Sequence, residues 1–221
     1  KNGEIMYIVI AVLALFVIGF TSFVMKKNRL DRKVLFLHEF IEKFREYCNS
    51  GGNNNEAYGW LIHRSNKMQN QLGSQGIVSS FKPPYANYCI NNYAIILNML
   101  PALNESLRES LLHGQAEQYA RAIDEALIRH WGSLSDREEF LGSRLRNPIY
   151  WFQQGIRQVT GVPFYILSLF GILSVGTANS IVGSALFGVL SGLVTLVGFA
   201  SAVLSLVVGW EDFLAKVQQF F

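Results

Sequence analysis

Charged side chains are scarce in this sequence of 221 residues. Asp, Glu, Lys and Arg together make up 16 % of the chain, against roughly 25 % in soluble globular domains. Residues 158–210 contain none of the four, and half of the whole sequence is hydrophobic. This composition excludes a disordered chain and an ordinary soluble domain. A protein that contacts a lipid bilayer is expected instead.

Cysteine and the common enzyme motifs are also lacking. Cys48 and Cys89 are the only two cysteines, and no C-x-x-C spacing is present. Reduced thiols in a cytoplasmic domain are therefore favoured over a disulfide or a metal site. The sequence has no glycine-rich phosphate loop, no nucleophile elbow and no H-E-x-x-H motif. We accordingly expect no enzyme activity, no metal and no cofactor.

The first long hydrophobic segment covers residues 5–25. Its polar side chains are Tyr7 near one end and the pair Thr21 and Ser22 near the other. At about 1.5 Å per residue this segment covers a hydrocarbon core of about 30 Å. We expect residues 1–25 to form a transmembrane helix rather than a cleaved signal peptide. Basic residues cluster directly after the segment, which predicts an N-terminus outside an inner bacterial membrane.

Residues 26–147 are expected to fold as a cytoplasmic bundle of helices. An apolar stripe with spacings of three and four residues continues the first helix to Cys48, and the Gly- and Asn-rich segment 50–55 ends it. Further helices are expected at 56–72, 85–100 and 104–131, and a capping box of Ser135 and Glu138 predicts another short one. Strand signals are nearly absent, so the predicted fold class is all-α, a membrane protein with an N-terminal transmembrane helix, a cytoplasmic helical bundle and a C-terminal hydrophobic transmembrane region.

A ligand site in this domain is suggested by a stretch without acidic residues. Residues 57–104 contain no Asp or Glu but carry cations among aromatic and amide side chains. Cations neutralise phosphate, aromatic rings stack on bases, and amides read base edges, so an anionic nucleotide or oligonucleotide is the expected ligand. The candidate ligand-binding residues are Trp60, His63, Arg64, Lys67, Lys82 and Tyr85. The alternative is that the aromatic residues are core and the cations ordinary surface.

Small and short polar side chains recur through the last third of the chain, in a helix expected over residues 181–210. They are spaced by about 3.6 positions, which places them on one helix face. The members are Ser184, Gly188, Gly192, Thr195, Gly198, Ala202, Ser205 and Gly209. Such a face lets a second backbone approach closely within lipid. It packs either on the first helix of the same chain or, as we expect, on further copies in a homo-oligomer with a narrow pore.

Between these regions, residues 148–178 are expected to form an amphipathic or re-entrant segment. Asn147 and Pro148 are typical of a helix start. Residues 162–175 are apolar but too short for a full crossing, and a break is expected at residues 161–163. Two membrane crossings are predicted, with three as the alternative. The predicted domains are therefore residues 1–25, 26–147, 148–178 and 179–221, the last comprising a transmembrane helix and a tail.

This order of segments resembles the membrane effectors of bacterial anti-phage systems, such as the Hailong effectors. The resemblance covers the whole chain as an architecture, with one N-terminal span, a helical cytoplasmic domain and a glycine-rich C-terminal membrane region. It implies a homo-oligomeric ion channel that depolarises the inner membrane in antiviral defence. It also implies gating by a nucleotide or oligonucleotide made by a partner enzyme.

Two other classes of protein stay open. A non-conducting membrane anchor would hold a cytosolic partner at the bilayer. A ribonuclease of the HEPN type would use Arg108 with His113, or Arg32 with His38. Spacings of this kind arise by chance in a chain with this many arginines and histidines. On a regular helix, residues five apart also point in different directions.

Overall fold

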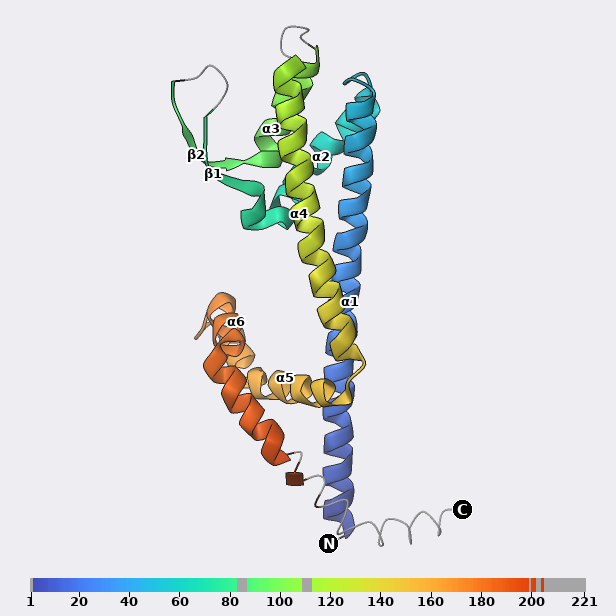
Figure 1. Cartoon of the computed structure of the whole chain (residues 1–221). Helices are drawn as coiled ribbons and strands as arrows, with labels where there is room; N and C mark the ends of the chain where they lie inside the picture. The colour runs from blue at the N-terminus through green and yellow to red at the C-terminus, as the bar shows by residue number, and fades with distance from the viewer. Residues whose placement is uncertain (1, 83–86, 109–112, 199, 202–203, 205–221) are drawn as a thin grey trace, which may run out of the picture. The chain divides into compact units, whose positions relative to one another are not determined.

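The chain is described by a computed structural model covering residues 2–82, 87–108, 113–198, 200–201 and 204. These residues are mostly helical (Figure 1). In chain order the elements are α1 (Asn2–Asn49), α2 (Asn55–Leu72), the 3-10 helix η1 (Gly73–Gly76), β1 (Ile77–Phe81), β2 (Ile90–Ala94), α3 (Ile95–Arg108), α4 (His113–Leu145), α5 (Pro148–Leu169) and α6 (Val175–Gly183). A further helix covers Ala185–Gly198.

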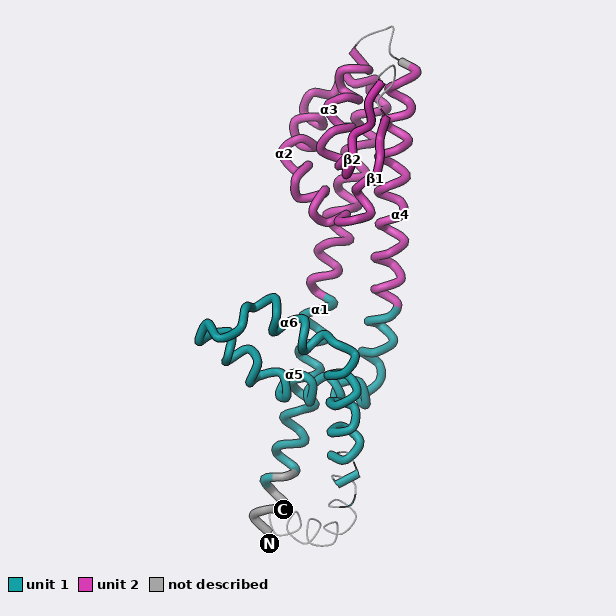
Figure 2. The backbone as a smooth tube through the Cα atoms, turned by 90° about the vertical axis from the view of Figure 1, so that its left-hand side faces the viewer, with its two compact units in different colours: residues 1–27, 140–221 teal, residues 28–139 magenta. Residues whose placement is uncertain are grey.

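The chain divides into two compact units, shown in different colours in Figure 2. Unit 1 comprises residues 1–27 and 140–221, and unit 2 comprises residues 28–139. α1 and α4 contribute residues to both units. Unit 1 thus joins the two ends of the chain, whereas unit 2 is one continuous segment.

The core of unit 2 is built on the second half of α1. Leu37, Ile41 and Phe44 are buried, as the apolar stripe predicts. α2, α3 and α4 supply the remaining core side chains, among them Leu61, Met68, Ile96, Leu100, Leu103, Ile123 and Leu127. The Tyr47 hydroxyl donates a hydrogen bond of 2.9 Å to Asn104 Oδ1, which joins α1 to α3. Burial of this continuous apolar set is the main stabilising contribution to the unit.

The end of α1 and the start of α2 follow the sequence prediction. Gly51 and Gly52 have positive φ angles of 61° and 83°, a backbone conformation that glycine adopts without steric cost. Asn54 then caps α2, because its side chain accepts a hydrogen bond of 3.0 Å from the Ala57 amide. The helix predicted at 56–72 is confirmed.

The helix predicted at 85–100 is wrong in its first half. β1 and β2 form an antiparallel hairpin in which Ile77 pairs with Ala94 and Phe81 with Ile90. The rings of Phe81 and Tyr93 stack with centroids 4.2 Å apart across the hairpin. β-branched and aromatic residues fit such a pleated surface. The expectation of no strands therefore fails here, and α3 begins only at Ile95.

The helix boundaries predicted after residue 100 are also wrong. α3 ends at Arg108, and α4 begins at His113. α4 then continues through Ser135 and Glu138 to Leu145, so this pair does not open a new helix. Leu134 is fully buried beside the proposed cap, and its burial favours an uninterrupted helix over the local capping signal.

Unit 1 shows one confirmed helix start and two corrections. Asn147 caps α5, accepting a hydrogen bond from the Ile149 amide, and Pro148 occupies the first turn. α5 does not break at residues 161–163 but runs through Pro163 to Leu169. The single helix expected over 181–210 is interrupted, because α6 and the helix Ala185–Gly198 meet with a bend of 59°. Ser184 lies at the bend, and its Oγ caps the second helix at the Phe187 amide.

α1 is the one helix among the described residues that is long and apolar enough to cross a membrane. It lies at the N-terminus, and its apolar window is mostly exposed. The bent pair Val175–Gly183 and Ala185–Gly198 passes the same test only when the two helices are taken together. The described residues thus provide one candidate crossing by α1 and a second candidate that is bent.

Candidate functional site

Two glycines bring α1 and α5 into direct backbone contact within unit 1. A Cβ atom added to Gly19 would overlap the Trp151 carbonyl oxygen, and one added to Gly155 would overlap the Leu15 carbonyl oxygen. The contact is therefore reciprocal, with each glycine facing the other helix. α5 crosses α1 beside the apolar residues 15–19 (Figure 1). Only glycine permits helices to approach this closely.

Aromatic rings flank the glycine contact. The Phe16 and Phe152 rings lie 5.1 Å apart, and the Phe20 and Trp151 rings meet edge to face at 4.8 Å. The Trp151 indole also donates a hydrogen bond of 3.1 Å to the Leu145 carbonyl. Aromatic pairs at these separations add to the stabilisation that area burial provides. They hold α5 against the apolar half of α1.

A polar cluster lies next to this contact. The Ser22 hydroxyl is 4 % exposed and accepts hydrogen bonds from Gln154 Nε2 at 3.2 Å and Gln158 Nε2 at 3.0 Å. Gln154 and Gln158 are one helical turn apart on α5, so both amides reach the same oxygen. Polar groups buried between apolar helices fix the register of the helices, because an unpaired polar group there is costly.

The small-residue face of the helix Ala185–Gly198 divides into two parts. Ser191 and Thr195 are buried within the chain, and their hydroxyls donate to the Gly188 and Ser191 carbonyls of their own helix. A Cβ added to Gly198 would lie 3.9 Å from Phe152. A Cβ added to Gly188 or Gly192 would meet no other residue within 4 Å in the part of the chain that the structure describes. The part around Gly188 and Gly192 therefore has room for another backbone, whereas Gly198 faces α5 of its own chain.

The remaining residues of this predicted face lie either at the bend or outside the described part of the chain. Ser184 lies at the bend as a helix cap. Ala202, Ser205 and Gly209 lie outside the described residues. The prediction that the face contacts sister copies stays a prediction.

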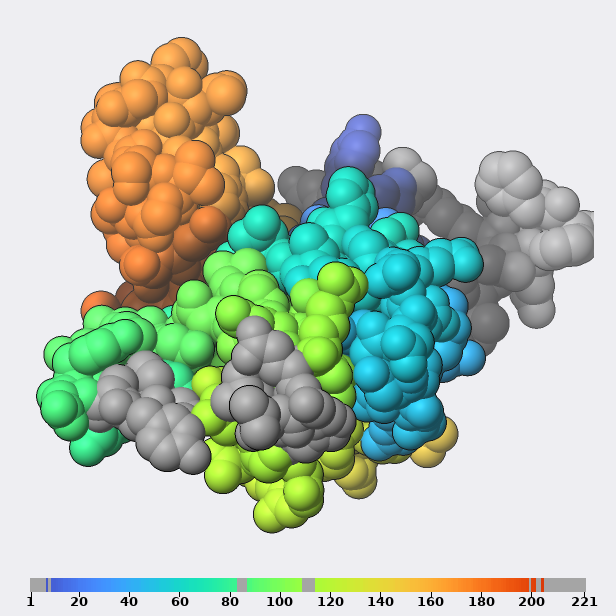
Figure 3. Space-filling model, turned by 90° about the horizontal axis from the view of Figure 1, so that it is seen from above, coloured from blue at the N-terminus to red at the C-terminus, as the bar shows by residue number. Residues whose placement is uncertain are grey.

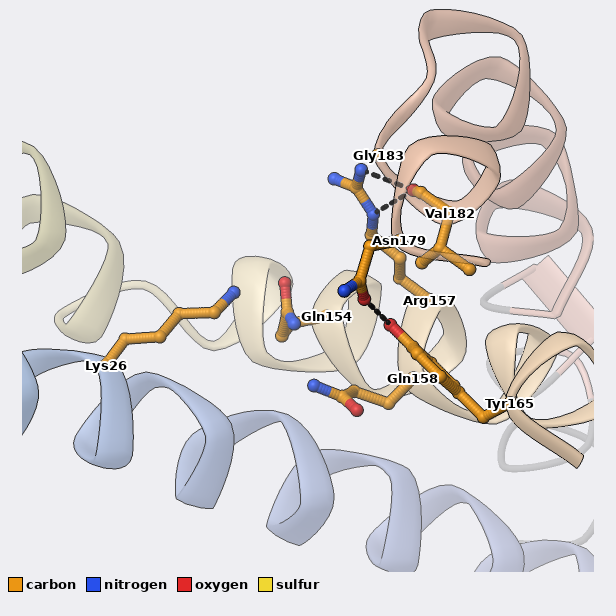
Figure 4. A pocket seen from close by; sticks show the side chains of 8 residues that line it. All are labelled: Lys26, Gln154, Arg157, Gln158, Tyr165, Asn179, Val182 and Gly183. Atoms are coloured by element: carbon orange, nitrogen blue, oxygen red, sulfur yellow. Dashed lines mark hydrogen bonds between the residues drawn. The ribbon is translucent and has the colours of Figure 1, made fainter. Parts of the chain in front are cut away.

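A polar cavity of about 320 Å³ opens between α1, α5 and α6 of unit 1 (Figure 4). Its polar lining residues are Lys26, Gln154, Arg157, Gln158, Tyr165 and Asn179. Arg157 donates from Nε and Nη2 to the Val182 carbonyl, at 3.3 and 2.7 Å. The Tyr165 hydroxyl donates to Asn179 Oδ1 at 3.2 Å. These bonds connect α5 to α6 beside the cavity.

The sequence-predicted ligand residues of α2 form a cation and aromatic cluster in unit 2. The Arg64 guanidinium lies 4.3 Å from the Trp60 ring centre, and the Lys67 ammonium lies 3.8 Å from that of Phe36. The Phe36 and Trp60 rings stack at 6.4 Å. Trp60, Arg64 and Lys67 lie on one helix face, as does exposed His63, because their spacings are three and four. Figure 3 shows α2 (cyan) beside α3 (green) at the surface of unit 2.

This cluster accounts for only part of the predicted ligand site. Lys82 is exposed at the end of β1, on the hairpin. Tyr85 lies outside the described residues. Arg64 and Lys67 already lie against aromatic rings of the chain. Such contacts stabilise the fold whether or not a ligand binds. Ligand binding at this cluster stays a prediction.

No protein-family model matches this chain, and no curated protein or solved structure is significantly similar to it. The class defined by the fold is accordingly a general one: a mostly helical protein whose described residues include one helix long and apolar enough to span a membrane.

Sequence reasoning missed the residues that hold unit 1 together. Gly19 and Ser22 lie in an apolar run, and Gly155 lies 136 positions after Gly19, so no local spacing relates them. Gln154 and Gln158 of α5 could have indicated a buried polar contact, because amides in an apolar segment need hydrogen-bond partners. That signal identifies a polar contact but not the serine that provides it.

Proposed function

We propose that this chain is a homo-oligomeric membrane effector of an ion-channel type. Unit 1 is embedded in the inner membrane and conducts ions when several copies assemble. Unit 2 is cytoplasmic and controls conduction, with the N-terminus outside. The single observation that carries this proposal is the open space beside Gly188 and Gly192 on an otherwise apolar helix.

The surface of unit 1 supports its placement in lipid. Leu169 and Leu186 are 84 % and 74 % exposed, and further large apolar side chains are exposed on α5, α6 and the helix Ala185–Gly198, among them Ile166, Val175, Val189, Leu193 and Val197. Exposed apolar side chains in this number favour a surface covered by lipid or by another protein. α1 supplies the span, and the bent pair of helices enters beside it as a second, re-entrant or spanning element.

The glycines identify where a second copy would pack. Among the described residues, no side chain lies within 4 Å of the Cβ position added to Gly188 or Gly192. A GxxxG pair facing open space allows a second helix to approach to backbone contact. Ser191 and Thr195 are buried within their own chain, and their hydroxyls donate to carbonyls of their own helix, so they would not line a path between copies. The glycines and the apolar side chains beside them would line a narrow, uncharged path that is gated by width and wetting.

The controlling ligand is a nucleotide or oligonucleotide made by a partner enzyme. The half-buried Arg64 beside Trp60, the exposed Lys67 beside Phe36, and the absence of acidic residues from 57–104 support an anionic, stacking ligand. Depolarisation of the membrane on ligand production would serve antiviral defence. This part of the proposal rests on the resemblance in segment order as well as on the cluster.

Ion flux across vesicles tests the proposal. The purified full chain, reconstituted in liposomes, is expected to dissipate a potassium gradient, and Gly188→Leu with Gly192→Leu is expected to abolish the flux. Because the open space leaves the fold of one chain undisturbed, the loss would report an intermolecular contact. Val189→Leu with Val197→Leu, which enlarges exposed positions of the same helix, is the matched control and retains flux. Flux that survives the glycine double variant contradicts the proposal.

A non-conducting anchor is the alternative function, and the inner part of the small-residue face favours it. Thr195 is buried and Gly198 faces Phe152, so this part of the face already packs within one chain. An anchor predicts silent vesicles and a monomer or dimer in mild detergent. The same liposome preparation distinguishes the two functions.

A further inference from the structure

We propose that the polar cavity of unit 1 binds a phosphate group. The phosphate would be carried by the headgroup of an anionic phospholipid or by a soluble phosphate compound. The inference requires neither conduction nor the nucleotide cluster of α2. It assigns a role to cationic and amide side chains that the proposed function leaves without one.

The charge of the cavity favours an anion. Lys26 from α1 and Arg157 from α5 both line it, and no Asp or Glu is among its lining residues. Among the described residues, neither cation forms a recorded ion pair with a carboxylate. Two like charges beside one low-dielectric cavity repel each other. A bound phosphate would compensate both.

The geometry of Arg157 suits a phosphate in particular. Its Nε and one terminal nitrogen are fixed on the Val182 carbonyl, so the guanidinium is held in one orientation. Figure 4 shows the other edge of the guanidinium on the cavity side, with the Lys26 ammonium extending toward the same space. A guanidinium fixed in this way presents further N–H donors to phosphate oxygens with little loss of side-chain entropy.

A neutral donor completes the cavity. Asn179 Oδ1 accepts from the Tyr165 hydroxyl, which turns the amide nitrogen of Asn179 toward the cavity (Figure 4). Gln154 and Gln158, which also line the cavity, each donate a hydrogen bond to the Ser22 hydroxyl. The volume of about 320 Å³ exceeds that of several water molecules of ~30 Å³ each, so a phosphate with its ester atoms fits.

The position of the cavity along α1 favours lipid as the source of the phosphate. Lys26 directly follows the apolar segment that ends at Met25. If α1 spans the bilayer, Lys26 is at the level where lipid phosphates lie, and basic residues there attract anionic headgroups. The chain then binds a lipid between α5, α6 and the end of its own span.

Lipid binding to the full chain in neutral detergent tests the inference. We expect phosphatidylglycerol to bind at least tenfold more tightly than phosphatidylcholine, measured by native mass spectrometry. Lys26→Gln and Arg157→Gln are expected to lose about tenfold of this affinity, because each removes a charge-assisted hydrogen bond. Arg146→Gln, an exposed cation outside the cavity, is the matched control and retains binding. Lys26→Gln is the decisive variant, since Arg157 also fastens α6 to α5.

A second arm distinguishes the two sources of phosphate. Inorganic phosphate and a nucleoside monophosphate are added in competition with phosphatidylglycerol. Competition at millimolar concentration assigns the cavity to soluble phosphate compounds, and its absence assigns it to lipid. The inference is overturned if neither phosphatidylglycerol nor soluble phosphate binds. It is equally overturned if Lys26→Gln binds both as the unchanged chain does.

Discussion

Single residues set how closely the helices of unit 1 approach. At positions 19 and 155, glycine is the only residue type that allows the contact between α1 and α5, because a Cβ at either position would overlap a backbone carbonyl. Backbone atoms cannot move aside as the end of a flexible side chain can. The packing of unit 1 should therefore depend on these two positions more than on the exposed glycines of the same unit.

Substitution of Gly155 tests this dependence. Gly155→Leu is expected to separate α5 from α1 and to destabilise unit 1 by at least ~3 kcal/mol, since the overlap is with backbone. The measurement is the thermal unfolding of the full chain in detergent, together with proteolysis after α4. Gly142→Ala is the control, because its Cβ would meet nothing within 4 Å, and it is expected to be neutral or to stabilise by up to ~1 kcal/mol. Equal melting temperatures for the two variants would contradict the contact.

His130 predicts a pH dependence for unit 2. It is 5 % exposed, its Nδ1 lies 3.1 Å from Gln75 Oε1, and its Nε2 has no partner among the described residues. Burial lowers the pKa of His130 below its usual 6.5, and Arg137 and Lys33 lower it further. Below pH ~6.5, His130 therefore binds a proton more readily in the unfolded state than in the folded state. The stability of unit 2 consequently falls as the pH falls below ~6.5.

The urea midpoint of unit 2 checks this dependence. We expect it to decrease from pH 7.5 to pH 5.5 in the unchanged chain, and to decrease less in His130→Gln. The comparison of the two chains removes the contribution of the carboxylates, which both share. Identical pH slopes would show that His130 is protonated equally in the folded and unfolded states.

At the scale of elements, one glutamine connects three of them. Gln69 on α2 donates from Nε2 to the Gly76 carbonyl of η1 at 2.9 Å, and its Oε1 accepts from the Ile96 amide of α3 at 3.0 Å. Both bonds are buried. The Gln69 side chain thus provides hydrogen-bond partners for one backbone carbonyl before the hairpin and one backbone amide after it. Buried backbone groups of this kind need such partners.

Removal of this side chain should loosen the hairpin. Gln69→Ala leaves a buried carbonyl and a buried amide without partners, which is expected to cost roughly 2–4 kcal/mol of unfolding free energy. Chemical denaturation measures this cost, and amide exchange at Ile96 reports the local opening. Asn70→Ala, the exposed neighbour on the same helix, is the control and should change stability by less than ~0.5 kcal/mol. A similar cost for both variants would refute the role given to Gln69.

The elements that the sequence predicted well are those with local signals. The apolar stripe and Gly51 and Gly52 define the end of α1, and Asn54 and Asn147 cap the following helices. The hairpin was missed because its strands are short and mostly exposed, so their alternation carries little pattern. The continuity of α4 and α5 was missed because burial of Leu134 and the packing of α5 outweigh a capping pair and a proline.

The candidate site was only partly predictable, because some of its residues share a local sequence pattern and others meet only through tertiary packing. The α2 cluster could be found because its members share one helix face. The contact of Gly19 with Gly155 and the cavity beside Lys26 join residues more than a hundred positions apart, so only the folded chain reveals them. The bend at Ser184 interrupts the helix that the sequence predicts over residues 181–210, and it lies at the first member of the small-residue face.

At the scale of the whole molecule, the two units differ in what covers their apolar residues. Unit 2 buries most of its large hydrophobic side chains in its own core, although some such as Leu35 are exposed. Those of α5, α6 and the helix Ala185–Gly198 are largely exposed. A unit with so much exposed apolar surface requires lipid or further copies of the chain. In the proposed assembly, a further copy would pack at the open space beside Gly188 and Gly192.

The stoichiometry of the full chain in mild detergent tests the central claim of self-association most directly. We predict a single discrete oligomer larger than a dimer for the unchanged chain, measured by light scattering corrected for detergent. Gly188→Leu with Gly192→Leu is predicted to convert it to a monomer with an unchanged helical content. A monomer for the unchanged chain, or an oligomer that the double variant leaves intact, would contradict assembly through this face.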